Sequence, residues 1–431
     1  MPASSDIRCG VARVDISPAI GTPLAGYPFV ERPCLGTHDP LYATAMVFEA
    51  RGAMAAIVAL DLLAVGPALV GAVREQAHRR FGISPDHLMV CATHTHSAPA
   101  LPLGPIADPG VYGIADPRYA DALPANVQAA IQTAASTLRP VDLTLSHVRV
   151  DGVTSNRRHP EGVTDPTVSV FCARDRTGGS VVGTLMTFAC HPTVLHADNR
   201  LASSDFPWAA RRVVEERAGG AALYATGAAG DQSTRYTRRA ASFDDAARLG
   251  AIVGDAAAAV ASHGTLLAGT GVRGRRRFVM LPLRRLPALH DAEHALARAE
   301  EHLADVTAAG APTAARRSAE VAVFGARHTT RWVKTGVGGS GDADAEVQVL
   351  SIGGLKIVGL PVELFAEDGL RLRVETAAPL ILVCYANDML GYAPPAAAFD
   401  EGGYEPSSTL LGPEARDRLM DATRDLLEAV P

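Results

Sequence analysis

Two histidines, His94 and His96, follow a short apolar run, Leu88–Val90, and precede Pro99, where the strand is expected to end. A buried strand that ends in this way places imidazoles at the rim of a sheet, where polar groups can meet a ligand. On an extended segment, residues two apart share a face, so both rings would point into one pocket. The pattern is typical of a metal or catalytic site. For an isolated pair, the alternative is two polar residues that cap a strand.

The same pattern recurs at His191, which follows the apolar run Val181–Phe188 and precedes a proline. Glu363 comes just after a Gly-x-Pro turn, and Tyr392 and Tyr404 lie in glycine-containing loops. Nitrogen and oxygen ligands without cysteine favour a catalytic zinc over a structural one, although they also suit other divalent metals. The alternatives are a first-turn acid of a helix for Glu363 and aromatic packing for Tyr392.

The composition excludes some classes of protein. The chain has 431 residues, of which 48% are hydrophobic and 20% charged, so it can bury a large core. A formal charge of −6 shows no basic surplus for nucleic acid, which we exclude as a partner. Arginines cluster at Arg235–Arg239 and Arg273–Arg277, which we interpret as a solvated face or an oligomer contact. The sequence leaves homo-oligomerisation open.

The sequence also indicates a cellular compartment. No basic segment followed by an apolar one opens the chain, and no apolar run is long enough for a transmembrane segment. The six cysteines show no CxxC spacing, and most lie in apolar runs, so we expect buried, reduced thiols. A cytoplasmic protein is therefore expected.

The order of the expected elements predicts an α/β fold. A strand over residues 54–60 is followed by helical spacing over Pro67–Phe81 and then by the strand that precedes His94. We expect mixed sheets flanked by helices and one catalytic domain over residues 1–431. Residues 309–344, rich in Ala, Gly and Arg, are expected to form a variable surface excursion.

A succession of motifs from near residue 10 to near residue 408 resembles that of the neutral/alkaline, non-lysosomal ceramidase family. The motifs are Gly10–Ala12, Asp15–Pro18, Gly26–Tyr27, His38–Ala43, Thr93–Ser97, Asn156–Arg157, Phe188–His191, Gly230–Ser233, Pro361–Glu363, Gly391–Tyr392 and Gly403–Glu405. The resemblance implies the α/β catalytic domain of such an enzyme, without the C-terminal immunoglobulin-like domain of the characterised ceramidases.

The resemblance also implies a zinc amidase and assigns its residues. The metal ligands that it implies are His94, His191, Glu363 and Tyr392. The residues that it places around the reacting carbonyl or in the substrate pocket are His96, Arg157, Tyr404 and Ser233. In such an enzyme Arg157 and Tyr404 would stabilise the oxyanion, and His96 would carry a proton to the leaving amine.

The substrate is expected to be a small-molecule N-acyl amide, either ceramide-like or another acylated amine, and the sequence disfavours a membrane sphingolipid without excluding ceramide. The segment around Ser233 reads Gly-Asp-Gln-Ser-Thr-Arg, where the family has Gly-Asp-Val-Ser-Pro-Asn, so the chain departs from the family beside the substrate. One alternative is ester, lactone or ring hydrolysis, or cyclisation, at a carbonyl in specialised metabolism. Another is a catalytically silent zinc-binding protein, which would have no need of His96, Arg157 and Tyr404.

Overall fold

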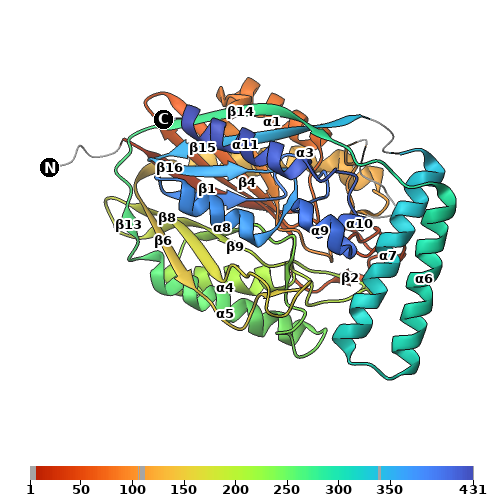
Figure 1. The fold of residues 1–431 in the computed structure, drawn as a ribbon. Helices are drawn as coiled ribbons and strands as arrows, with labels where there is room; N and C mark the ends of the chain where they lie inside the picture. Colours follow the sequence, from red (N-terminus) through yellow and green to blue (C-terminus); the bar gives the residue numbers. More distant parts are fainter. Residues whose placement is uncertain (1–5, 105, 107–111, 338–340, 431) are drawn as a thin grey trace.

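The computed structural model describes residues 6–104, 106, 112–337 and 341–430, and a large mixed sheet forms its centre (Figure 1). In spatial order its strands are β11 (Ala221–Thr226), β9 (Val181–Phe188), β8 (Thr167–Asp175), β6 (Arg139–Arg149), β1 (Arg8–Asp15), β3 (Tyr42–Ala50), β4 (Ala53–Leu60) and β5 (Leu88–Ala92), with β13 (Thr265–Leu266) beside β6. Among these strands only the β9–β11 and β4–β5 pairs are parallel; the other neighbours are antiparallel.

A second sheet packs on the first. Its order is β14 (Val272–Pro282), β15 (Asp342–Ile352), β16 (Leu355–Gly359) and β18 (Leu380–Val383). Gly353 and Gly354, both at positive φ, form the two-residue turn of the β15–β16 hairpin that their sequence predicts. Side chains such as Phe48 of the large sheet and Ile357 of the small one share a single buried cluster. The interior between the sheets is therefore apolar and fixes how they lie on each other.

Helices cover the outer faces of the two sheets (Figure 1). α3 (Pro117–Ser136) packs against β1, β3 and β4, and α1 (Pro67–Phe81) packs beside α3. Val73 of α1 and Val127 of α3 share one buried cluster with side chains of β3 and β4. α4 (Phe206–Ala218) and α5 (Phe243–Ala261) pack on β6, β8 and β11, and α11 (Ala415–Ala429) packs on β14 and β15. The predicted fold class, mixed sheets flanked by helices, is confirmed.

A helical hairpin stands at one side of the molecule (Figure 1). It consists of α6 (Leu289–Ala308) and α7 (Thr313–Thr335). Most of residues 309–344, which were expected to form a surface excursion, therefore belong to one long helix, α7. Ala319, Val323 and Trp332 of α7 are buried, so this helix packs against the rest of the chain. Residues 338–340 of the segment lie outside the described residues, and its end belongs to β15.

The remaining elements are short. They are η1 (Pro85–His87), β2 (Gly36–Thr37), β7 (Ser155–Asn156), β10 (Leu201–Ala202), β12 (Gln232–Ser233), β17 (Glu363–Leu364), β19 (Tyr392–Ala393), α8 (Ala366–Glu375), α9 (Ala396–Glu401) and α10 (Tyr404–Ser407). The expectation that Glu363 opens a helix is wrong: it lies in β17, which pairs with β19, and α8 begins only at Ala366.

Two sequence-based expectations concern the cysteines and membrane spans. All six cysteines are buried, and none forms a disulfide. Within the ranges that the structure describes, no helix combines the length and the apolar character that crossing a bilayer requires.

Candidate active site

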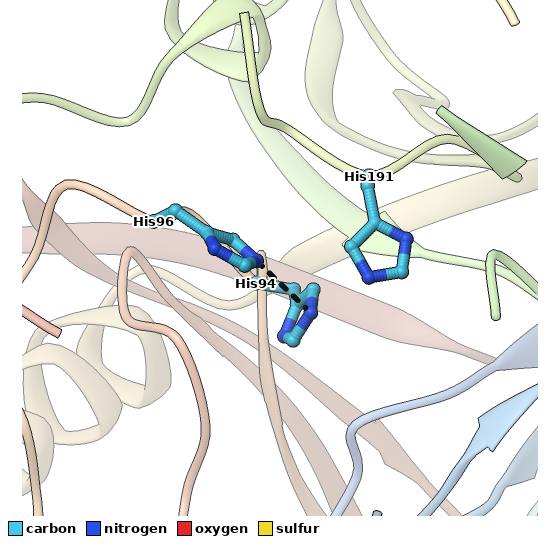
Figure 2. Close-up of side chains that lie close together, drawn as sticks. All are labelled: His94, His96 and His191. Carbon is cyan, nitrogen blue, oxygen red and sulfur yellow. Dashed lines mark hydrogen bonds between the residues drawn. The ribbon is translucent and has the colours of Figure 1, made fainter. Parts of the chain in front are cut away.

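Three histidines from two strand ends meet in the interior (Figure 2). His94 and His96 follow β5, and His191 follows β9. Their ring nitrogens lie within 4.8 Å of one another. The sequence predicted this meeting but assumed an extended backbone, whereas His94 has a left-handed φ of 64°. A non-glycine residue in this region is uncommon and clusters at functional sites.

The Nδ1 atom of each of these rings faces a backbone carbonyl. The pairs are His94 with Leu63 at 2.7 Å, His96 with Gly26 at 2.6 Å, and His191 with Ala229 at 2.6 Å. A carbonyl oxygen only accepts, so each Nδ1 carries the proton and each Nε2 offers a lone pair. The Nε2 atoms of His94 and His96 lie 3.4 Å apart, which brings two lone pairs face to face.

Glu363 adds a carboxylate to the same point. Its Oε2 lies 2.9 Å from Nε2 of His191 and 3.5 Å from Nε2 of His94, and the side chain is buried. Lone pairs and a negative charge that converge in a buried site repel one another unless a proton or a metal cation lies between them. Imidazole and carboxylate ligands held by such hydrogen bonds are the set that zinc takes in catalytic sites, so the residues fit a bound metal.

The titration of these groups agrees with this arrangement. Burial and the nearby Arg157 lower the pKa of His191 to about 4. Burial and the neighbouring His94 hold the pKa of His96 well below its usual range. Burial alone would raise the pKa of Glu363, but His94 and His191 lower it. His96 and His191 are therefore neutral and Glu363 is ionised near pH 7, and these are the forms that bind a metal.

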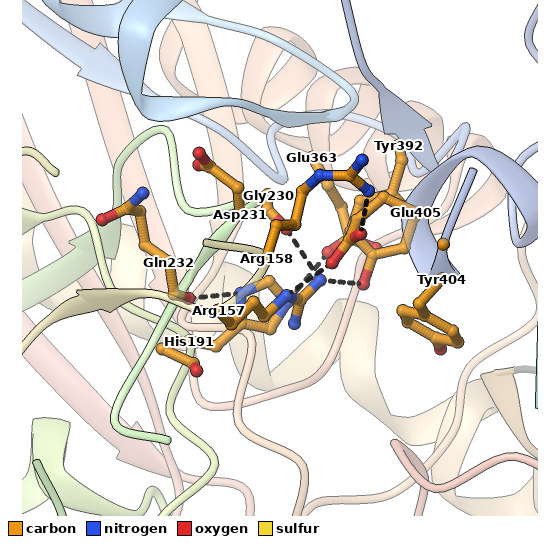
Figure 3. A network of polar contacts seen from close by, with 12 residues as sticks. Arg157, Arg158, His191, Gly230, Asp231, Gln232, Glu363, Tyr392, Tyr404 and Glu405 are labelled. Carbon is orange, nitrogen blue, oxygen red and sulfur yellow. Dashed lines mark hydrogen bonds and ion pairs between the residues drawn. The ribbon is translucent and has the colours of Figure 1, made fainter. Parts of the chain in front are cut away.

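Tyr392 and Arg157 form a second layer beside the histidines (Figure 3). Backbone pairing of β17 with β19 places Tyr392 directly opposite Glu363. Nη2 of Arg157 donates to the hydroxyl oxygen of Tyr392 at 2.9 Å and to the carbonyl of Gly230 at 2.7 Å, and Nε donates to Glu405 at 2.8 Å. Burial raises the pKa of the Tyr392 phenol, so its hydroxyl stays protonated near pH 7. Arg157 therefore fixes the orientation of Tyr392.

Tyr404 and Ser233 complete the set of predicted residues. The Tyr404 ring, at the start of α10, lies 5.7 Å from that of Tyr392 in an edge-to-face contact. Ser233 is bridged to His191 along the backbone, and its Oγ accepts from the amide of Arg235 at 3.2 Å. The structure thus gathers all eight predicted residues in one region, although which of them bind a metal stays a prediction.

A pocket of about 60 Å³ opens beside this constellation. Predicted site residues that line it are His96, Arg157, Ser233, Tyr392 and Tyr404. A hollow of about 810 Å³ elsewhere contains none of these side chains, so size does not locate the site. The smaller pocket lies against these predicted site residues, and we take it as the candidate substrate pocket.

Other histidines and acids have separate roles. His196 lines the pocket beside Tyr27, whereas His159 lies at the surface against Glu401. Asp61, a candidate partner for a metal-binding histidine, instead pairs with Arg211 at 2.6 Å.

Sequence reasoning missed Tyr385, whose ring stacks on that of His94 at 3.9 Å. It also assigned no role to Glu405, which bonds both Arg157 and Arg158. Tyr385 carries the same sequence signal as the histidines, a polar side chain just after a buried strand: it follows β18 (Leu380–Val383) and Cys384.

Comparisons with known proteins identify the family and the fold. Residues 7–233, just over half of the chain, match the family model described as neutral/alkaline non-lysosomal ceramidase, N-terminal. No curated protein matches the chain. A neutral ceramidase structure from Pseudomonas aeruginosa is similar with a TM-score of 0.76 and 21% identity, covering 99% of this chain and 75% of that one.

A second solved structure, a ceramidase complexed with C2, is similar with a TM-score of 0.77 and 19% identity, again over 99% of this chain and 75% of the other. At these identities the structural likeness shows the shared fold. The family match rests on the sequence itself and includes the segments that carry His94, His96, Arg157, His191 and Ser233. This chain therefore belongs to the neutral/alkaline non-lysosomal ceramidase family.

Proposed function

We propose that this protein is a zinc-dependent hydrolase that cleaves the amide bond of a small N-acyl compound other than a sphingolipid. The observation that carries the proposal is the convergence of the Nε2 atoms of His94 and His191 with the carboxylate of Glu363. Tyr392, which pairs with Glu363 in β17–β19, is the proposed fourth ligand. A divalent metal held there supplies Lewis-acid chemistry that activates water and polarises a carbonyl.

The residues around this point supply the other parts of an amide hydrolysis. His96 is neutral near pH 7 and lies next to His94, so it can take a proton and pass it to the leaving amine. Arg157 and the hydroxyl of Tyr404 line the pocket and can donate to the oxyanion of the tetrahedral intermediate. Ser233 forms part of the pocket wall. These positions are what an amidase needs and a silent metal-binding protein does not.

The test is hydrolysis by the purified protein of N-acyl amides that differ in acyl chain and amine, with a short-chain ceramide among them. Matched esters and lactones with the same acyl groups are assayed in parallel. We expect amides to be cleaved, with the ceramide among the poorer substrates. Cleavage of esters or lactones alone would shift the assignment to the alternative carbonyl chemistry, and no cleavage of any compound would leave a silent zinc-binding protein.

Gly26 provides a test of His96 that leaves the ring itself intact. Gly26 has a φ of 102°, and a Cβ there would lie 2.6 Å from the Cβ of His96. Gly26→Ala is therefore expected to displace His96 and lower amide hydrolysis by about 10- to 100-fold, since small displacements of catalytic groups cost this much. The measurement is kcat for the best amide of the panel, together with the melting temperature.

Gly21 is the matched control for this substitution. It lies in the same loop at a φ of 93°, and a Cβ there meets nothing within 4 Å. Gly21→Ala carries the same backbone strain and is expected to keep the wild-type rate. Equal rates for the two variants would mean that the position of His96 does not matter to the reaction.

A further inference from the structure

The substrate pocket is unusually rich in positive charge. Besides Arg157, its walls contain three more arginines, Arg235, Arg238 and Arg317, and no aspartate or glutamate. Arg235 and Arg238 lie between β12 and α5, and Arg317 comes from α7. We call Arg235, Arg238 and Arg317 the arginine cluster. Two separate parts of the chain thus direct guanidinium groups to one small space.

Two members of the arginine cluster have no carboxylate partner. Nη1 of Arg238 donates to the carbonyl of Thr193 at 2.7 Å, and Nη1 of Arg235 donates to the carbonyl of Arg157 at 3.1 Å and to the hydroxyl of Ser318 at 3.3 Å. Within the described part of the chain, neither guanidinium makes an ion pair, whereas Arg317 pairs with Glu320 at 2.8 Å. Partly buried cations that face only neutral acceptors favour an anion nearby.

The pocket also excludes a long apolar group in this conformation. Its volume of about 60 Å³ holds only ~4 water molecules. The apolar side chains at its wall, Val321 and Phe324, come from α7, and the Phe324 ring lies beneath the guanidinium of Arg317 at 5.7 Å. The surface available to a ligand is therefore mainly cationic and aromatic.

We infer that the arginine cluster binds an anionic group of the substrate, a carboxylate or a phosphate, so that the substrate class is an anionic N-acyl amide. The inference rests on the proposed function, because it names the substrate of the same site. Guanidinium groups suit this task, since their planar N–H pairs match carboxylate and phosphate oxygens. Arg157 is left for the reacting carbonyl because its contacts with Glu405, Gly230 and Tyr392 hold its guanidinium beside the predicted site residues.

The test measures binding separately from hydrolysis. The probes are two matched pairs: N-acetylglycine with N-acetylglycinamide, which differ in charge on the amine side, and an N-succinyl amine with the corresponding N-butyryl amine, which differ on the acyl side. Calorimetry on the purified, metal-containing protein gives Kd for each compound. We expect the anionic member of at least one pair to bind about 10-fold or more tightly than its neutral partner.

Variants locate the source of this preference. Arg238→Gln and Arg317→Gln are each expected to reduce the ratio of the two Kd values to about 2-fold. Arg239→Gln is the control, because Arg239 is an exposed neighbour that does not line the pocket, and the ratio should stay at the wild-type value. In the wild type the preference should also fall as salt is raised, a result that does not depend on any variant folding.

Three outcomes separate the two proposals. Equal binding within both pairs, or a preference that Arg238→Gln and Arg317→Gln leave unchanged, overturns the inference; the second result would indicate an anion bound directly to the metal. Hydrolysis of amides without a charge preference supports the proposed function alone. A charge preference that depends on the arginine cluster, without hydrolysis of any amide, supports the inference and contradicts the proposed function.

Discussion

Replacing His191 with alanine is expected to remove the bound zinc and to lower amide hydrolysis by more than about 1000-fold, since a bound metal contributes several kcal/mol of transition-state stabilisation. His191 is the residue whose Nε2 lies closest to Glu363, at 2.9 Å, and its loss leaves the buried carboxylate facing His94 alone. The measurement is the metal content per chain beside kcat/KM. Chelation of the wild type should abolish hydrolysis, and added zinc should restore it.

His147→Ala is the control for this experiment. His147 is a half-buried histidine of β6 that contacts Ser169, and it takes no part in the three-histidine group. We expect this variant to keep its metal and its rate. If His191→Ala retained a full equivalent of metal, the proposed ligand set would be wrong. If it lost the metal but kept the rate, the metal would be structural and the hydrolytic mechanism would have to change.

Parts of the fold that depend on local pattern were predictable. The helix expected over Pro67–Phe81 has those bounds in the structure, because a proline suits the first turn and Gly82 ends the helix in a left-handed conformation. The apolar run Val181–Phe188 is a fully buried strand with the bounds expected. The histidines after such strands met as predicted, although β5 and β9 lie near opposite edges of the large sheet. They come together because β11, the neighbour of β9, contacts β5, and Thr226 donates to the carbonyl of Thr93 there.

The failures come from pairings between distant segments. Glu363 was expected at a helix start, but it pairs with Tyr392 in two short strands that no local pattern reveals. Non-local pairing of this kind overrides local preference, because it satisfies buried backbone groups. The left-handed backbone of His94 was also invisible, since non-glycine residues, histidine included, adopt that conformation only rarely.

The arginines show the same limit. Arg235–Arg239 was interpreted as a solvated face or an oligomer contact, which does not hold for Arg235 and Arg238, because both line the pocket; Arg239 is exposed. The helix that closes over them was missed, although its Ala-rich composition and the apolar spacing of Ala319 and Val323 were visible in the sequence. Which face of a loop a helix covers depends on tertiary packing, and no motif encodes it.

Arg157→Lys is expected to lower kcat for amide hydrolysis by about 100-fold or more, with little change in KM, as when one donor to an oxyanion is lost. One planar guanidinium donates at once to Tyr392, Gly230 and Glu405, and a lysine ammonium lacks the fixed spacing that these contacts need. The substitution keeps a positive charge beside Glu405, so that buried carboxylate stays paired. The fall in kcat therefore reports the lost geometry of the guanidinium donors. The measurement is kcat and KM with the best substrate.

Arg158→Lys controls for effects that pass through Glu405. Arg158 bonds the other oxygen of that carboxylate at 2.8 Å (Figure 3). Its second nitrogen donates to Glu401, and Arg158 does not line the pocket. We expect its rate to fall by less than about 5-fold, as for most substitutions away from the reacting atoms. Equal losses for both lysine variants would show that Glu405, and not the donors of Arg157, governs the rate. A rise in KM at constant kcat for Arg157→Lys would mean that Arg157 binds substrate and transition state alike, and Tyr404 would then remain as the proposed donor to the oxyanion.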